Sequence, residues 1–337
     1  MSSPTPLQKA WLARLRPELP RYFPDARGHL DLRIAGPPEL RTNSRLFPFT
    51  LLEDGLPRAE ILVKAPQGRK AANVRLAFEA YRLLNRRLAD DPDLAAPEAL
   101  DAWEDPPALI MIRAEGDPLF LRMRDCRNWA GEAGCQLAQN FVRLAGRWLA
   151  RLHDTRPPDW SRPAPAPLAR LDDWLNTLRA HGIDPLEEKR IRDRTRILAD
   201  APPSGAAPLH GDFTLRNVLC RLPQHITVLD TELAQHGDPA ADIGWFLAAL
   251  HAIDKWQIVG GEMVYTRAVI RQTENAFLQG YESVRPLPPK EIIRAYTTLR
   301  LTERWAEFVE REKQRDIAGL RTFVIRRINQ HFVRAMG

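Results

Sequence analysis

Cysteine is scarce in this sequence. The 337 residues include only Cys126, Cys135 and Cys220, an odd number without a C-x-x-C spacing. This argues against a disulfide framework and against a structural zinc site. Long hydrophobic runs are absent too: Met1 to Pro20 has no apolar core of the kind a signal peptide needs, and no later segment approaches the ~20 apolar residues of a membrane span. We therefore expect a cytoplasmic protein without a membrane span.

A common nucleotide motif is also missing. No G-x-x-x-x-G-K-[ST] occurs in the chain, which excludes a P-loop enzyme as far as a motif can. A phosphate site in this protein would have to be built from other loops.

The charge balance does not single out a partner. There are 49 basic and 43 acidic residues, a formal charge of +6, and arginine dominates the basic residues. Such a balance fits either a nucleic-acid partner or a basic nucleotide site. Arg304, Glu307 and Arg311 alternate in sign at spacings of three and four, which is typical of a solvated helix face. Nucleic-acid binding is therefore the function that the sequence favours least.

Secondary-structure patterns change along the chain. Strand-like segments, separated by Gly, Pro and Asp turns, come first, and a helix is predicted after them. Apolar residues at spacings of three and four then predict helices for most of the remainder. The strands are expected at 30–34, 47–52, 60–64 and from 109, and the helices at 72–88, 136–153, 168–180, 185–199 and beyond 244.

The most informative stretch runs from residue 208 to 244. Asp212 is followed five positions later by Asn217, and Asp230 ends a short apolar run. Phosphoryl transfer needs a carboxylate that orients the attacking hydroxyl and oxygen ligands that hold magnesium on the nucleotide. The spacing D-x-x-x-x-N with a later Asp supplies both.

The ordered set carries a family resemblance. Over 33 residues the chain has H-G-D at 210–212, Asn217, D-T-E at 230–232 and D-P-A-A-D at 238–242. This resembles the aminoglycoside phosphotransferase and choline kinase superfamily, the small-molecule relatives of protein kinases. Taken singly, each of these residues fits an ordinary turn or strand end. Taken together, they favour the kinase interpretation.

The resemblance implies roles for these residues. Asp212 would accept the proton of the acceptor hydroxyl. Asn217 and Asp230 would bind Mg2+. Glu232 would be a further metal ligand or a residue that contacts the metal ligands. His210 would be structural, and Asp242 would tie down the backbone of the catalytic loop.

The N-terminal part resembles the nucleotide-covering lobe of a kinase. Lys64 ends the third predicted strand, and Glu79 lies fifteen residues later on a predicted helix. In the family such a pair places the lysine on the α- and β-phosphates. A lysine at a strand end is otherwise an ordinary surface charge.

The phosphate-covering loop departs from the kinase pattern. The candidate segment, from Arg41 to Arg45, has no glycine, unlike G-x-G-x-x-G. Asn43 and Ser44 are the residues there that could meet phosphate through amides and a hydroxyl. Adenine would meet the backbone of Ile112 and Ala114, because that segment resembles the kinase hinge.

The resemblance implies an α+β, two-lobed, protein-kinase-like fold. Residues 1–112 would form a small antiparallel β-sheet lobe, and residues 113–337 a larger, mainly helical lobe. A helical insertion at about 154–207 would wall the acceptor pocket.

The predicted function is O-phosphorylation of a small hydroxylated molecule, a metabolite or an aminoglycoside-like compound, with ATP (or GTP) and Mg2+. The alternative is an inactive kinase-like module that binds nucleotide. The acceptor stays open: the glutamates of the C-terminal helices could bind a cation, whereas Arg326 and Arg327 could bind an anionic or sugar group.

Overall fold

The computed structural model describes residues 5–41, 43–68, 73–200, 206–313 and 320–336. It divides into two compact units. The N-terminal unit comprises Met1–Glu115 together with Thr227–Glu232, and the C-terminal unit comprises Gly116–Ile226 and Leu233–Gly337. The predicted lobes, 1–112 and 113–337, place the boundary three residues earlier and omit the returning segment. As functional domains they stay a prediction.

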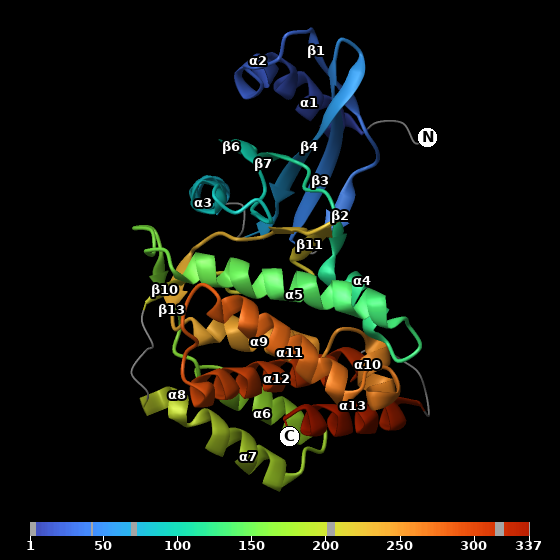
Figure 1. Cartoon of the computed structure of the whole chain (residues 1–337), viewed down its shortest axis with the longest axis vertical. Helices are drawn as coiled ribbons and strands as arrows, with labels where there is room; N and C mark the ends of the chain where they lie inside the picture. Colours follow the sequence, from blue (N-terminus) through green and yellow to red (C-terminus); the bar gives the residue numbers. More distant parts are fainter. Residues whose placement is uncertain (1–4, 42, 69–72, 201–205, 314–319, 337) are drawn as a thin grey trace. The chain divides into compact units, whose positions relative to one another are not determined.

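The N-terminal unit is built on an antiparallel sheet in the order β1-β3-β4-β7-β6, with β2 paired to β3 (Figure 1). The predicted strands fall in β1, β3, β4 and β7, while β2 and β6 were not predicted. The bounds are β1 Leu30–Ile34, β2 Glu39–Arg41, β3 Ser44–Glu53, β4 Leu56–Pro66, β6 Ala99–Glu104 and β7 Pro107–Ile112.

Helices cover this sheet. The helices α1 (Pro6–Leu15) and α2 (Leu19–Tyr22), joined by the 3-10 turn η1 (Arg16–Glu18), contribute the buried Trp11, whose ring stacks 5.7 Å from Trp103 of β6. The helix α3 (Val74–Leu88) packs against β6 and β7. Ala72, where this helix was predicted to begin, lies outside the described residues. These contacts give the N-terminal unit its own apolar core.

The C-terminal unit is mainly helical. The long α5 packs on α11, α9 packs on α12, and α12 also contacts α6, α7 and α13 (Figure 1). The predicted insertion at about 154–207 contains α6, α7 and α8. The helix bounds are α4 Leu119–Arg122, α5 Glu132–His153, α6 Leu171–Ala180, α7 Pro185–Thr195, α8 Ile197–Asp200, α9 Ala240–Leu250, α10 Lys255–Gly260, α11 Arg267–Glu282, α12 Lys290–Lys313 and α13 Leu320–Met336, with 3-10 turns η3 Met123–Cys126 and η4 Gly261–Met263.

Short strands link these helices. In the C-terminal unit β11 pairs with β8, and β13 pairs with both β10 and β9. The bounds are β5 Leu94–Ala95, β8 Asp117–Pro118, β9 Arg162–Pro163, β10 Ala207–Leu209, β11 Val218–Arg221, β12 His225–Val228 and β13 Gln235–Gly237. The pairing of β10 with β13 fixes the chain directly before the H-G-D motif.

Two glycines lie where α5 crosses α11. A Cβ added to Gly146 of α5 would lie 2.0 Å from the carbonyl oxygen of Phe277, and one on Gly280 of α11 would lie 1.9 Å from that of Arg143. Both distances are far inside van der Waals contact. The backbones of α5 and α11 therefore touch, and only glycine fits at either position.

The cysteine prediction needs a correction. Cys126 and Cys135 form a disulfide, with their Cα atoms 4.3 Å apart, and Cys220 is free and buried. Cys126 ends η3 and Cys135 lies in the first turn of α5, so the turn between them brings the two close. An odd total count excludes complete pairing but not a single local pair. Burial raises the pKa of the Cys220 thiol to about 12.

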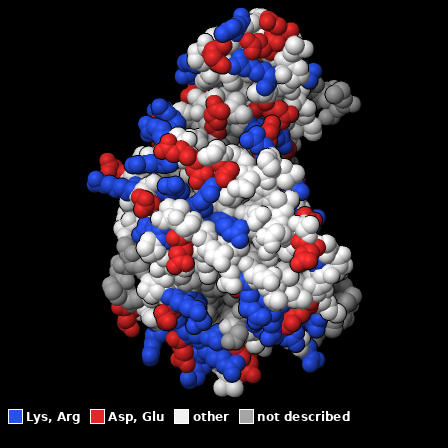
Figure 2. Space-filling model, viewed as in Figure 1, with Lys and Arg blue, Asp and Glu red and all other residues white. Residues whose placement is uncertain are grey.

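The surface carries both charge signs. On the face seen in Figure 2, Lys and Arg side chains are interspersed with Asp and Glu rather than gathered into a stripe. Among the described residues, no helix is both long enough and apolar enough to cross a membrane.

Candidate functional site

The loop after β10 is held through its backbone. The N–H groups of His210 and Gly211 donate to the two carboxylate oxygens of Asp242, at 2.7 and 2.9 Å. Gly211 has a φ of 80°, which glycine adopts without steric cost. Asp242 lies in the first turn of α9 and is 2% exposed. A buried carboxylate thus fixes the direction of the chain as it enters the H-G-D motif.

A buried histidine completes this support. His153, the last residue of α5, lies with Nε2 3.2 Å from Asp242 and Nδ1 3.0 Å from the Tyr281 hydroxyl. Burial lowers the pKa of His153, although the hydrogen bond to Asp242 opposes the shift. Burial alone would raise the pKa of Asp242, but the contacts with His153, His210 and Gly211 outweigh it and lower the pKa. The pair is therefore a neutral imidazole donating from Nε2 to an ionised carboxylate.

Asp212 faces solvent while its carboxylate is held at both oxygens. The Trp245 indole N–H donates to Oδ1 at 3.1 Å, and the Asn217 amide donates to Oδ2 at 3.2 Å and to the Asp212 carbonyl at 2.9 Å. Because the Asn217 nitrogen is used in this way, its Oδ1 remains as an acceptor. An exposed, oriented carboxylate is what a base for an incoming hydroxyl requires.

The His210 side chain packs inside the C-terminal unit. Its ring meets Trp148 and Phe213 edge-on, with centroids 6.2 and 5.3 Å away, and its Nδ1 accepts from the Asp212 N–H at 3.3 Å. The structural role expected for His210 stays a prediction.

Asp230 belongs to the N-terminal unit through the returning segment. Lys64 of β4 forms an ion pair with its Oδ1, and the Asp230 backbone N–H donates to the Tyr81 hydroxyl at 3.0 Å. Asp230 has a φ of 58°, in the left-handed region that non-glycine residues rarely adopt. Strain of this kind persists where the surroundings enforce it, and here the buried Tyr81 does so. Burial raises the pKa of Tyr81, which keeps its hydroxyl neutral.

The predicted partner of Lys64 has other contacts. Among the described residues, the ion pairs of Glu79 run to Arg75 at 3.4 Å and Arg82 at 4.0 Å, both on its own helix α3. The side chain of Lys64 contacts Asp230 instead. The Lys64–Glu79 pair therefore stays a prediction, as does the metal role of the partly buried Glu232.

The remaining nucleotide residues lie on the N-terminal sheet. Asn43 is exposed in the turn between β2 and β3, and Ser44 begins β3 with 6% exposure; Thr42 lies outside the described residues. The Ile112 N–H already donates to the Glu98 carbonyl at 2.9 Å, so it is not free for adenine. Contacts of nucleotide with Asn43, Ser44, Ile112 and Ala114 stay predictions.

Comparison with known proteins decides the family. A model of the phosphotransferase enzyme family matches residues 49–287. The chain belongs to this family. No curated relative matches the chain.

Solved structures agree with this phosphotransferase in fold. A Ralstonia eutropha protein named as a candidate aminoglycoside phosphotransferase is 15% identical, with a TM-score of 0.59 over 97% of this chain and 96% of that one. The macrolide 2'-phosphotransferase MphH of Brachybacterium faecium is 19% identical, with a TM-score of 0.51 over 94% and 98%. Spectinomycin phosphotransferase, crystallised with ADP and spectinomycin, is 14% identical, with a TM-score of 0.55 over 96% and 97%. The predicted protein-kinase-like α+β fold is confirmed.

The side chains of this phosphotransferase suit magnesium. Asn217 offers an amide oxygen and Asp230 a half-exposed carboxylate, and oxygen donors are what Mg2+ prefers. No three His, Cys, Asp or Glu side chains in the described ranges could hold a metal on their own. Magnesium binding therefore stays a prediction.

Four contributors to the site were not predicted from the sequence of this phosphotransferase. Tyr81, His153 and Trp245 orient the two motif segments, and Tyr281 holds His153. The sequence gives a weak indication of Tyr81 and His153, because each is a polar group on the apolar face of an amphipathic helix. It gives none of Trp245 and Tyr281, since aromatic residues on buried helices are ordinary core residues.

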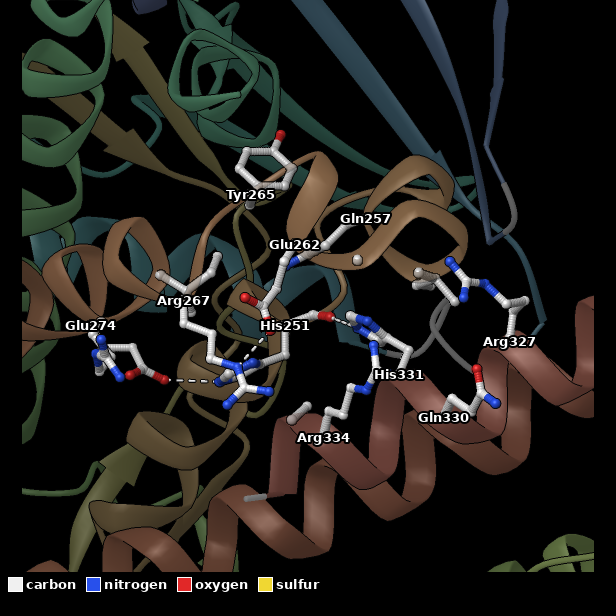
Figure 3. A pocket seen from close by; sticks show the side chains of 15 residues that line it. His251, Gln257, Glu262, Tyr265, Arg267, Glu274, Arg327, Gln330, His331 and Arg334 are labelled. Carbon is white, nitrogen blue, oxygen red and sulfur yellow. Dashed lines mark hydrogen bonds and ion pairs between the residues drawn. The ribbon is translucent and has the colours of Figure 1, made fainter. Parts of the chain in front are cut away.

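A separate pocket of this phosphotransferase lies between α10, η4, α11 and α13, with a volume of about 270 Å3 (Figure 3). His251 pairs with Glu274 at 2.9 Å, and the carbonyl of His251 accepts from the His331 Nε2 at 2.5 Å. Burial lowers the pKa of His331 to about 4. The residues that line it come from 251–274 and 327–335, whereas the Asp212 loop follows β10, so this pocket is distinct from that loop.

Proposed function

We propose that this protein transfers the γ-phosphoryl group of ATP, or of GTP, to a hydroxyl of a small molecule. The observation that carries the proposal is the state of Asp212. Its carboxylate is exposed and held at both oxygens, on a loop whose backbone is fixed from behind by Asp242. Family membership and the nucleotide in the spectinomycin phosphotransferase structure support the same reaction class.

The proposed reaction replaces one phosphorus–oxygen bond with another. The acceptor oxygen forms a bond to the γ-phosphorus while the bond from that phosphorus to the β–γ bridging oxygen breaks, and ADP leaves with the electron pair. Asp212 orients the hydroxyl and takes its proton. Magnesium, when bound by Asn217, Asp230 and Glu232, would neutralise charge on the nucleotide phosphates.

Lys64 has a place in this proposal. It pairs with Asp230 in the structure. In the proposed complex the Lys64–Asp230 ion pair would break. Lys64 would bind the nucleotide phosphates, with Glu79 as its alternative partner, and Asp230 would bind the metal. We further propose that the protein works in the cytoplasm.

The test is acceptor-dependent ADP formation, with ATP or GTP and magnesium, by the wild-type protein and by Asp212→Ala. We expect Asp212→Ala to lose on the order of 10²-fold or more in kcat, because a positioned base supplies about that much. Nucleotide binding should persist in the variant. Undiminished turnover in Asp212→Ala would remove the catalytic assignment. Nucleotide binding without magnesium dependence, and without turnover of any acceptor, would favour the inactive nucleotide-binding module.

A further inference from the structure

The helix α12 presents a basic face next to Asp212. Arg300 and Arg304 are four residues apart, so they lie on the same face of the helix. The Arg300 guanidinium stands 3.9 Å above the ring of Trp245, whose indole N–H donates to Asp212. This basic face of α12 therefore lies next to Asp212, the proposed catalytic base.

The carboxylates on this face are already paired. Glu303, which is 8% exposed, lies 2.8 Å from Arg300 and 4.0 Å from Arg170. Glu307 pairs with Arg311 at 3.6 Å. A cationic acceptor would have to displace an arginine to reach either carboxylate.

Arg304 differs from its neighbours. It is partly buried, and in the described part of the chain no hydrogen bond or ion pair joins it to another residue. Burial lowers the pKa of its guanidinium, while the charges of Glu307 and Asp212 act in the opposite direction. Both carboxylates act at a distance, without direct contact. A guanidinium on the same helix face as Arg300, without a bonded partner among the described residues, has its donors available to an anion.

We infer that the acceptor carries a carboxylate or phosphate group and that Arg304 binds it while the acceptor hydroxyl meets Asp212. The inference rests on the proposed function and narrows its acceptor class. The planar guanidinium can bind either anion with two parallel hydrogen bonds, which gives orientation as well as affinity. Arg216, on the Asp212 loop, adds positive charge to the same neighbourhood. Arg304 is thus a specificity-determining residue.

The first arm of the test compares acceptors by charge. Acceptor-dependent ADP formation is measured with D-glycerate, D-ribose 5-phosphate, glycerol, choline and kanamycin. We expect the highest kcat/KM with an anionic compound, and the ratio between glycerate and ribose 5-phosphate tells carboxylate from phosphate. A higher kcat/KM for choline or kanamycin would overturn the inference and leave the phosphotransferase proposal standing.

The second arm changes Arg304. In Arg304→Gln the KM for the anionic acceptor should rise roughly 10- to 100-fold, as for a lost bidentate ion pair, while kcat and the KM for ATP change little. Arg304→Lys should recover part of the loss. Arg311→Gln is the matched control, because Arg311 lies two turns along the same helix and pairs with Glu307. Equal KM values in wild type and Arg304→Gln would refute the role of Arg304.

A binding measurement keeps the inference testable without turnover. The affinities for 3-phosphoglycerate of the wild type, Arg304→Gln and Arg311→Gln are compared by calorimetry, with melting temperatures as the check on folding. Weaker binding in Arg304→Gln alone supports the anion site even if no acceptor in the panel reacts. Equal binding by all three proteins overturns it. Failure of the phosphotransferase proposal has a different signature: no ADP formation with any acceptor and no effect of Asp212→Ala.

Discussion

The Asp212 loop and the Asp230 turn each hold an exposed carboxylate in place, but they do so with different buried groups. Each puts an exposed carboxylate on a backbone with an unusual conformation, at Gly211 and at Asp230 itself. In the C-terminal unit a buried carboxylate, Asp242, accepts two backbone N–H groups. In the N-terminal unit a buried neutral hydroxyl, that of Tyr81, accepts one. The difference teaches that the Asp212 loop depends on a buried charge, whereas the Asp230 turn does not.

The largest effect is expected from Asp242→Asn. The amide has one acceptor oxygen where the carboxylate has two, so its NH2 would face the backbone N–H of His210 or Gly211. We expect a loss on the order of 3 kcal/mol in unfolding free energy, together with reduced kcat. Urea denaturation measures the stability.

The control for this change is Asp238→Asn. Asp238 accepts the Ala240 N–H at 2.8 Å through one oxygen, which an asparagine can replace. It should stay within about 1 kcal/mol of wild type. Equal losses of unfolding free energy in both variants would mean that the second acceptor oxygen of Asp242 is not required.

Acid should weaken the C-terminal unit selectively. Burial lowers the pKa of His331 from ~6.5 in the unfolded chain to about 4 in the folded protein, so between these pH values the unfolded chain binds more protons. Unfolding free energy should therefore fall as pH drops from ~6.5 to about 4, by on the order of 3 kcal/mol from this group. The lowered pKa of buried His153 gives the same sign. The N-terminal segment 1–115 contains only His29, which is exposed.

This pH dependence can be measured by urea denaturation at several pH values. His331→Gln keeps an N–H donor for the His251 carbonyl and removes the titration, so its dependence below pH ~6.5 should be shallower. His29→Gln is the control. A wild-type slope retained in His331→Gln would contradict the assignment.

A smaller effect is expected from Tyr81→Phe, which removes the hydroxyl that accepts the Asp230 N–H. The hydrogen bond from the Asp230 N–H to the Tyr81 hydroxyl is lost, at a cost of about 1–2 kcal/mol. Hydrogen exchange of the amides at 230 and 231 should accelerate. Tyr296→Phe serves as the control, since no residue in the described ranges is hydrogen-bonded to that hydroxyl. Unchanged hydrogen exchange in Tyr81→Phe would show that the Asp230 turn keeps its conformation without the Tyr81 hydroxyl.

The smallest effect is expected from Trp245→Phe. It removes one hydrogen bond to Asp212 and keeps an aromatic ring under Arg300, so kcat should fall by about fivefold, as for one hydrogen bond of ~1 kcal/mol, with the KM for ATP unchanged. Trp256→Phe, at a 68% exposed position, is the comparison. A KM change without a kcat change would assign Trp245 to acceptor binding instead.

The sequence predicted the features that depend on residues close together in the chain. Short spacings singled out Asp212, Asn217 and Asp230 as candidates, and their roles stay predictions. The strands β1, β3 and β4 were predicted because turn residues bound them. The supports were not predictable, since Tyr81 reaches Asp230 from a distant helix and His153 reaches Asp242 across 89 positions. The Cys126–Cys135 pair was missed for a related reason: parity says nothing about which turn brings two thiols together.

The glycine crossing of α5 and α11 limits how this protein can evolve. Tyr281 directly follows Gly280, and its hydroxyl meets His153 at the end of the same α5 that Gly280 touches. A side chain larger than hydrogen at 146 or 280 would separate the helices and withdraw Tyr281 from His153, and thereby loosen Asp242. In the acceptor site that we propose, surface substitutions on α12 would change acceptor preference without moving this crossing. The crossing itself admits almost no variation, because a change there would be felt at the Asp212 loop without any contact with substrate.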